Sequence, residues 1–210
     1  MNSALDTTLV PMLLRPALES GDRFTRAEFE ARSEARPDLK QVELIEGVVY
    51  VAPPKGVRSH GLPAGMMLGW LGLYVAATPG LISASFTTVR LDNTNVPQPD
   101  GLLAFERTAE GKPRTDSEDI FAGPPELIVE ISASSASYDL HDKKRAYERN
   151  GVREYVVVIV EQQRVAWFEL IAGRFQEQSA VEGIHRSRQF PGLWLDVAAL
   201  FDNDLPRLFA

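Results

Sequence analysis

The sequence predicts a single α/β domain in which a mixed β-sheet is flanked by helices. The chain has 210 residues, a length at which one domain with one sizeable core is the usual outcome. Hydrophobic residues make up 44% of it and charged residues 24%, values typical of globular proteins. Hairpin patterns occur together with a strand–helix–strand crossover over residues 126–160. This combination favours a mixed sheet over a purely antiparallel one.

The first helix is predicted by a capping box. Thr25 belongs to the residue types that favour helix N-termini, and Glu28 follows three positions later, so that each side chain can bond the other's backbone N–H. The helix is expected to continue to about Glu34. Residues 1–22 contain two prolines and no clear periodicity. We expect them to be a poorly structured lead-in to a single domain over residues 23–210.

The remaining elements are predicted from periodicity and turn residues. Short β-branched runs predict strands, apolar residues three and four positions apart predict helices, and glycine or proline marks their ends. In the first half of the chain these signals predict a hairpin at 41–45 and 48–52 around Glu46-Gly47, a helix from His60 to about Ala77, a strand at 81–91 with a turn at Asp92-Asn93, and a strand at 101–105. A polar loop at 108–118 is followed by a strand at 126–132, a helix at 139–150 and strands at 154–160 and 164–170. The last predicted elements are a hairpin around Gly173 and an apolar tail at 193–209 that packs on the domain.

The charge balance and the lack of cysteine limit the partners. The formal net charge is −7 and the isoelectric point is near 5.1, whereas proteins that bind nucleic acid usually show a basic footprint. Tight non-specific DNA binding is therefore not expected, although a local basic patch or bound Mg²⁺ can offset an acidic surface. Without cysteine, disulfides and thiolate metal sites are excluded. We expect a cytoplasmic protein without a membrane partner, because no apolar run is long enough to span a bilayer and no signal-peptide pattern is present.

Two carboxylates stand at or inside apolar strands. Asp100 follows Pro99 and opens the apolar run 101–105, and Glu130 lies inside the apolar run 127–132. A lone buried charge is costly unless it is paired or bound to a metal. Two carboxylates on neighbouring strands repel each other and so favour a cation between them. Hard oxygen ligands without cysteine favour Mg²⁺ or Mn²⁺ over zinc.

The helix after Glu130 offers a lysine. Asp139, Lys143 and Tyr147 are four positions apart and share one helix face. From that face a lysine can reach back over the end of the strand that contains Glu130. There its charge would orient a nucleophilic water and stabilise the charge that develops on a phosphate. Lys144 belongs to the same basic run, which could also be an ordinary solvated helix face, so the residues alone leave the choice of lysine open.

Several short segments recur in a characteristic order. They are Glu43-Leu-Ile-Glu46-Gly47, Pro53, His60 at the start of a helix, Val96-Pro-Gln-Pro-Asp100, Pro125-Glu-Leu-Ile-Val-Glu130-Ile-Ser132, Asp139-x-x-x-Lys143-x-x-x-Tyr147 and Gly151-Val-Arg-Glu-Tyr155. In this order and spacing they resemble the Uma-type family of predicted restriction endonucleases. That bacterial family was first catalogued as a domain of unknown function and belongs to the PD-(D/E)XK nuclease superfamily. The resemblance covers roughly residues 24–205.

The resemblance implies a restriction-endonuclease-like core and a role for each matching residue. Asp100 and Glu130 would be the metal carboxylates and, with Lys143, the catalytic residues. The peptide carbonyl of Ile131 would be a further metal ligand. The superfamily's usual lysine, two residues after the acid, is replaced by Ser132. Lys143 on the next helix fits the role that this lysine would have.

Two other matching positions are less clear. Glu43 would be an additional acidic residue of the site, but Glu46 lies close to it in sequence. Strand alternation points the two side chains to opposite sides, so one of them is expected to be only a turn residue. Gly101 departs from the family pattern, which tends to have a bulky aliphatic residue after Pro-Asp.

Simpler interpretations of the same residues stay open. Asp100 follows a proline and suits a turn or a strand entry. Glu130 could lie on a sheet edge or pair with Arg145. His60 could begin or cap a helix instead of contacting a phosphate. Tyr147 suits core packing better than chemistry.

The family resemblance predicts a Mg²⁺- or Mn²⁺-dependent endonuclease that hydrolyses DNA phosphodiester bonds. Because members of this family tend to self-associate, the resemblance also implies a homodimer, whose two sites could address both strands. The rival hypothesis is a non-catalytic protein that keeps the nuclease fold for binding or assembly. The acidic isoelectric point, Ser132 and the lack of a recognisable DNA-reading module favour this rival. A third hypothesis is a hydrolase for a small phosphorylated or nucleotide substrate.

Overall fold

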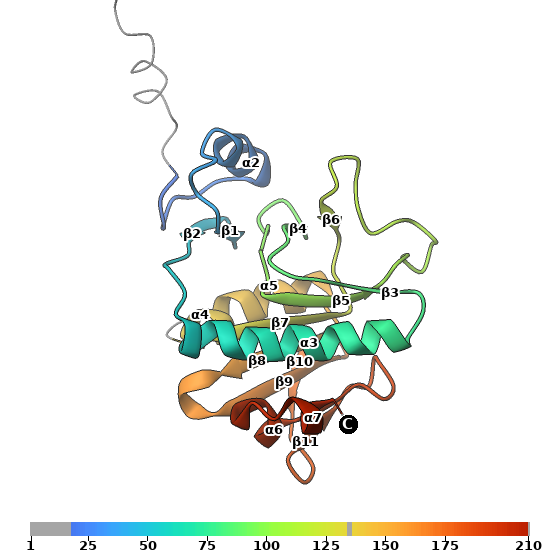
Figure 1. Cartoon of the computed structure of the whole chain (residues 1–210). Coiled ribbons are helices and arrows are strands. Elements are labelled where there is room, and N and C mark those ends of the chain that lie inside the picture. The colour runs from blue at the N-terminus through green and yellow to red at the C-terminus, as the bar shows by residue number, and fades with distance from the viewer. Residues whose placement is uncertain (1–17, 134–135, 210) are drawn as a thin grey trace, which may run out of the picture.

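A six-stranded mixed sheet forms the centre of the computed structural model, which describes residues 18–133 and 136–209 (Figure 1). The strand order is β10-β9-β8-β7-β5-β3. The strands are β3 (Leu81–Ala84), β5 (Gly101–Phe105), β7 (Leu127–Ser132), β8 (Glu154–Ile159), β9 (Arg164–Ile171) and β10 (Arg174–Gln178). Within this sheet β7 and β8 pair in parallel and the other neighbours pair antiparallel. The predicted mixed sheet is confirmed.

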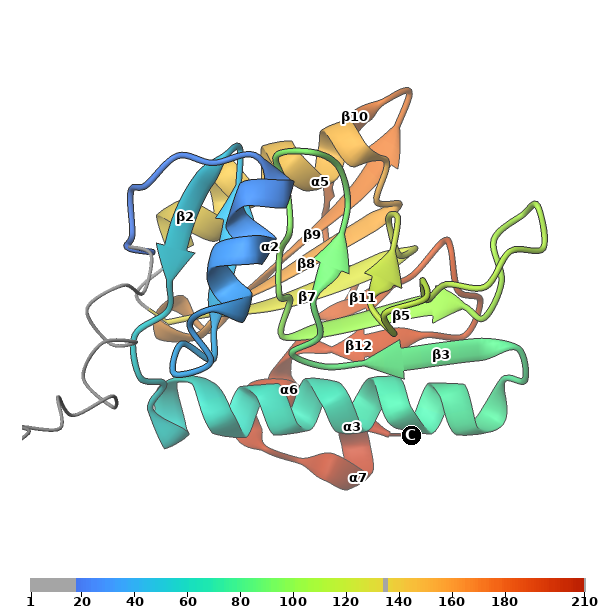
Figure 2. The same cartoon turned by 90° about the horizontal axis from the view of Figure 1, so that it is seen from above.

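Helices cover both faces of the sheet (Figure 2). One face packs on α3 (Leu62–Ala77), and the C-terminal helices α6 (Val197–Asp202) and α7 (Leu205–Leu208) join the same core. The other face packs on α5 (Lys144–Asn150). The predicted packing of the apolar tail on the domain is therefore confirmed.

The alternation of side chains along β7 decides on which face Glu130 lies. Val129 and Ile131 belong to the core beneath α3, and Ile128 belongs to the core that includes Tyr147 of α5. Successive residues of a strand point to opposite faces. Glu130 therefore lies on the α5 face, at a position where an apolar residue would otherwise fill the core.

A helical crossover connects β7 to its parallel neighbour β8, as a parallel pair requires. It consists of α4 (Ala136–Tyr138), a π-helical turn η2 (Asp139–Lys143) and α5, so helical structure begins three residues earlier than predicted. The helix ends at Gly151, which has a φ of +83° and donates its N–H to the carbonyl oxygens of Tyr147 and Glu148. Glycine adopts this left-handed conformation without steric cost.

The predicted N-terminal helix and hairpin are confirmed and form a layer beside the sheet. They are α2 (Arg26–Glu34), capped by Thr25 and Glu28 as predicted, and the strands β1 (Val42–Ile45) and β2 (Val48–Val51). The lead-in prediction needs a correction at its end. Leu18 is buried in the core of this layer, and Gly21 donates its N–H to Val49, so ordered packing starts by Leu18. The earlier part of the predicted lead-in, residues 1–17, lies outside the described residues.

The predicted strand at 81–91 is confirmed at its two ends but is not continuous. The chain leaves the central sheet after β3, and Val89–Arg90 forms β4, which pairs with β6 (Phe121–Ala122) in a separate sheet. Phe86 lies between them with a φ of +52°, and its N–H bonds the carbonyl of Pro99. This long-range bond, with that of Val89 to Pro97, turns the chain at a place where the local pattern contains no turn residue.

Two short helical turns and a small two-stranded sheet are the remaining elements in the described residues. A π-helical turn η1 (Val57–Gly61) precedes α3, so the helix predicted from His60 begins earlier. A 3-10 turn η3 (Val160–Gln162) joins β8 to β9, and β11 (Ile184–Arg186) pairs with β12 (Trp194–Asp196).

The glycine at position 101, which departs from the family pattern, has a structural reason. A Cβ atom there would lie 3.1 Å from Leu68 and 3.5 Å from Leu71, so α3 crosses the start of β5 at close range.

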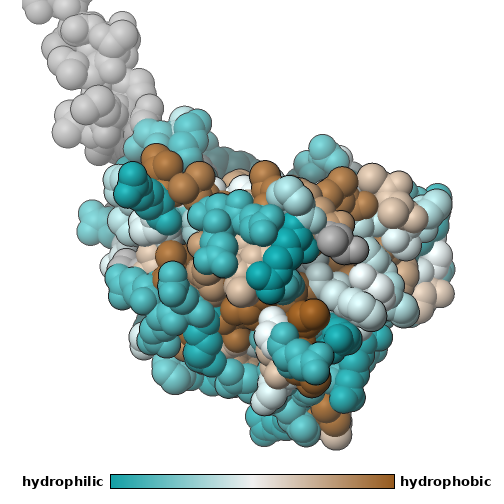
Figure 3. Space-filling model, turned by 60° about the horizontal axis from the view of Figure 1, so that its bottom comes forward, coloured by the Kyte–Doolittle hydropathy of each residue, from teal (hydrophilic) through white to brown (hydrophobic). Residues whose placement is uncertain are grey.

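Within the described ranges, the helices are all too short or too polar to cross a lipid bilayer. On the face shown in Figure 3, apolar patches are separated by hydrophilic surface.

Candidate active site

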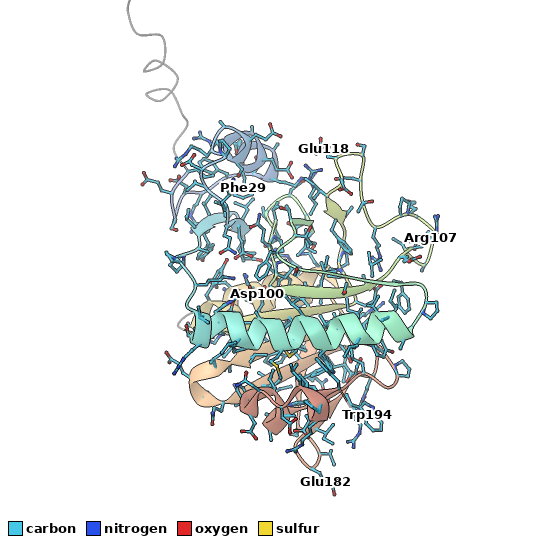
Figure 4. The ribbon with its side chains drawn as sticks, in the orientation of Figure 1. Phe29, Asp100, Arg107, Glu118, Glu182 and Trp194 are labelled. Atoms are coloured by element: carbon cyan, nitrogen blue, oxygen red, sulfur yellow. The ribbon has the colours of Figure 1, made fainter. Side chains whose placement is uncertain are left out.

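Asp100 and Glu130 lie opposite each other on neighbouring strands. The register pairs Gly101 of β5 with Val129 of β7, and one step further along these antiparallel strands Asp100 faces Glu130. Residues directly opposite in such a pair point to the same face of the sheet. Figure 4 labels Asp100 where β5 begins, between α3 and the β1–β2 hairpin in that view. Both carboxylates are buried, with exposed fractions of 4% and 3%.

Three groups hold Asp100. Its Oδ2 accepts the backbone N–H of Ile131 at 2.8 Å and lies 3.1 Å from Nε2 of His60, and its Oδ1 accepts Lys55 Nζ at 2.6 Å. Burial by itself would raise the pKa of Asp100. The hydrogen bond with His60 and the charge of Lys55 outweigh it and lower the pKa to about 2. Asp100 is therefore an ionised carboxylate in a fixed orientation, and a simple role in a turn does not explain its burial.

Glu130 is held from the helical crossover. Its Oε1 accepts Lys143 Nζ at 2.9 Å and the Tyr147 hydroxyl at 2.8 Å. Burial raises the pKa of Glu130 to about 8, against the opposing charge of Lys143, and Asp100 adds to the increase. The alternative pairing with Arg145 is wrong, because Arg145 bonds Asp142 on the exposed side of the helix.

Lys143 is the centre of a buried charge cluster. Its Nζ lies 2.9 Å from Glu43 Oε1 as well as from Glu130, and 4.0 Å from Asp139 Oδ1. Burial opposes the charged form, but the neighbouring carboxylates outweigh it and hold the pKa of Lys143 above its ordinary value. Lys144 points elsewhere, with its Nζ 3.9 Å from the centre of the Phe168 ring. The structure thus places Lys143, and not Lys144, beside Glu130.

Glu43 and Glu46 separate as strand alternation predicts. Oε1 of Glu43 accepts the backbone N–H of Gln98 at 2.7 Å in addition to its ion pair with Lys143. Glu46 occupies the hairpin turn with a φ of +54° and pairs with Arg149. Glu43 therefore belongs to the site and Glu46 is a turn residue.

Three further candidates from the sequence are Ser132, Ile131 and His60. Ser132 is fully buried on β7, and its Oγ has no hydrogen-bond partner among the residues that the structure describes. Ile131 lines the cavity beside Asp100 and bonds it through its N–H; a metal-binding role of its carbonyl stays a prediction. His60 lies in the turn η1 that precedes α3, and its Nε2 contacts Asp100 Oδ2 at 3.1 Å.

The carboxylates lie at the floor of a cavity of about 370 Å³. Several lining residues were not predicted from the sequence. They are Lys55 in the loop after β2, Tyr50, Phe86, Gln98 and Tyr138. The spacing of Tyr147 from Lys143 indicated its position on the site face, and its hydroxyl bond to Glu130 adds to its packing in the core. No local pattern indicates Lys55 or Phe86, because loops bring them in from distant parts of the chain.

The family model of Uma2, described as "Putative restriction endonuclease", matches residues 26–198 of this chain. The chain belongs to the Uma2 family. Its fold is similar to the crystal structure of a "putative nuclease belonging to DUF820" from Anabaena variabilis, with a TM-score of 0.61 and 15% sequence identity, over 77% of this chain and 89% of that one. At this identity the similarity shows a shared fold. Among curated proteins, no match to the chain is found.

The resemblance to nucleases implies a divalent metal, and the donor atoms of this Uma2 chain fit Mg²⁺ or Mn²⁺. Within residues 18–133 and 136–209 there is no group of three or more histidine, aspartate or glutamate side chains that could hold an ion. Mg²⁺, however, is commonly bound by one or two carboxylates with water and substrate phosphate. Asp100 and Glu130 supply two such carboxylates on one face, and Lys55 Nζ lies 2.6 Å from Oδ1 of Asp100.

Proposed function

We propose that this protein is a metal-dependent endonuclease that hydrolyses phosphodiester bonds of DNA. The main support is the pair of facing carboxylates, Asp100 and Glu130, with Lys143 Nζ 2.9 Å from Glu130 at the floor of a cavity. Membership of the Uma2 family supports the nuclease assignment. A Mg²⁺ or Mn²⁺ ion would neutralise the scissile phosphate and lower the pKa of the attacking water.

The protein's own residues prepare the site for this reaction. The Ile131 N–H and His60 fix the orientation of Asp100, and the Tyr147 hydroxyl fixes that of Glu130. Such pre-organisation lowers the entropy lost when reacting groups are aligned. Lys143 has a buried charge that can orient a water or stabilise the negative charge that develops on the phosphate.

The rival proposal is a binding protein that has kept the nuclease fold without catalysis. It is favoured by Ser132 at the usual lysine position and by the small number of carboxylates able to hold a metal in the described part of the chain. The rival does not explain why Lys143 is buried against Glu130 and Glu43.

A cleavage assay separates the two proposals. Supercoiled plasmid and a single-stranded oligonucleotide are incubated with the wild-type protein and Mg²⁺, Mn²⁺ or EDTA. We expect cleavage with either metal and none with EDTA. Linear plasmid would support a homodimer whose two sites cut both strands, whereas nicked circles alone would indicate single sites. Intact DNA under every condition would contradict the nuclease proposal and leave the binding protein.

A further inference from the structure

The depth of the site restricts what can reach it. Asp100 and Glu130 are almost completely buried at the floor of the cavity, whose volume is about 370 Å³. In a stacked duplex each phosphate belongs to a broad, paired structure. Enzymes whose reacting group lies in a narrow pocket act on a nucleotide that has left the stack or was never paired. The cavity is thus better suited to one unpaired nucleotide than to a duplex.

The cavity walls are rich in flat apolar groups. The rings of Tyr50 and Tyr138 contact each other in a tilted arrangement with centroids 4.1 Å apart, and both residues line the cavity together with Phe86, Pro53 and Pro54. Aromatic side chains of this kind stack on nucleobases with little dependence on the base sequence.

Phe86 has a backbone conformation that core packing does not explain. Its φ of +52° lies in the left-handed region, which is unfavourable for a bulky residue, and its exposed fraction is 43%. The bond from its N–H to Pro99 ties it to the residue next to Asp100. Strained residues held by their surroundings are concentrated at functional sites. The strain here fixes an exposed aromatic ring beside the carboxylates.

Lys55 connects this ring to the acidic site. Its Nζ lies 2.6 Å from Oδ1 of Asp100 and 5.1 Å from the centre of the Phe86 ring. The side chain comes from an exposed loop and can move when a ligand enters. A nucleotide stacked on Phe86 would place its phosphate close to this positive charge.

We propose that the cavity binds an unpaired nucleotide, with Phe86 stacked on its base and Lys55 beside its phosphate. The natural substrate is then single-stranded or locally unpaired DNA. This inference rests on the proposed nuclease function for the reaction, but the binding itself can be measured separately.

The test measures binding without cleavage. A fluorescein-labelled oligonucleotide, single-stranded or annealed to its complement, is titrated with the full chain in EDTA and followed by fluorescence anisotropy. The variants are Phe86→Leu, which removes the ring but keeps an apolar side chain, and Phe86→Trp, which keeps an aromatic ring. Phe105→Leu is the matched control. Phe105 is about as exposed as Phe86, at 41%, but it lies at the end of β5 that is away from Asp100. Circular dichroism checks that each variant is folded.

We expect the wild type to bind the single strand more tightly than the duplex. Phe86→Leu should weaken single-strand binding about 5- to 150-fold, the range that corresponds to the loss of one stacked base. Phe86→Trp should retain the affinity, and Phe105→Leu should not change it. Equal affinity for single strand and duplex, or unchanged single-strand binding by Phe86→Leu, would overturn the inference.

The cleavage assay on the same preparations separates this inference from the proposed function. If Phe86 controls single-strand binding but no metal supports cleavage, the nuclease proposal fails and the nucleotide cavity stands. If the wild type cuts DNA and Phe86→Leu binds and cuts like the wild type, the nuclease proposal stands and the cavity inference fails.

Discussion

Replacing Lys143 by alanine is expected to lower the free energy of unfolding by about 3–5 kcal/mol, the usual result of removing one partner of a buried ion pair. The Lys143 side chain is almost completely buried, and its Nζ contacts Glu130 and Glu43 at 2.9 Å each. Without it, these carboxylates and Asp139 remain together with no cation at their centre. Urea denaturation followed by circular dichroism measures the loss.

The neighbouring lysine provides the control for this experiment. The Nζ of Lys144 lies over the Phe168 ring, so Lys144→Ala should lower the free energy of unfolding by no more than about 1 kcal/mol. Similar losses for the two variants would show that the buried cluster does not depend on Lys143.

Mn²⁺ or Mg²⁺ is expected to raise the melting temperature of the wild-type protein, and Asp100→Asn is expected to abolish this increase. A ligand that binds only the folded state at 100 times its dissociation constant stabilises it by about 2.7 kcal/mol. For a chain of this size each kcal/mol corresponds to a shift of about 2–4 °C. Asparagine keeps the shape and can still accept the Ile131 N–H bond, but it removes the charge that attracts the ion.

The control for the metal experiment is a distant carboxylate. Asp38 is exposed and pairs with Arg36, so Asp38→Asn should keep the full metal-dependent shift. Differential scanning fluorimetry with and without metal measures all three proteins. The metal site is wrong if the wild type shows no shift, or if Asp100→Asn shifts as much as the wild type.

The sequence predicts the acidic pair and its lysine because local periodicity determines their positions. Glu130 interrupts an apolar strand, which is costly without a partner, and Asp100 opens the neighbouring strand. The helical spacing of Asp139, Lys143 and Tyr147 matches the family pattern and so favours Lys143, which the structure places against Glu130. Strand and helix periods, together with the family pattern, thus locate residues that lie on regular elements.

The rest of the site depends on long-range contacts that no local pattern contains. Lys55 reaches Asp100 from a loop 45 residues away in sequence, and His60 reaches it from the turn before α3. Phe86 was assigned to a continuous strand because its neighbours are β-branched and apolar. Its bond to Pro99 breaks that strand and moves the ring to the cavity. Tertiary hydrogen bonds therefore override local propensity at the residues that shape the cavity.

The first-order rate of plasmid nicking by Glu130→Gln, compared with that of the wild type, is the decisive measurement. Glutamine has the shape of glutamate and can still accept the Tyr147 hydroxyl bond, so the variant should fold while its carboxylate is lost. If Asp100 and Glu130 together drive metal-assisted hydrolysis, the rate with Mn²⁺ should fall on the order of 10³-fold or more. A Glu130→Gln preparation that nicks DNA as fast as the wild type would contradict a nuclease site at these two carboxylates.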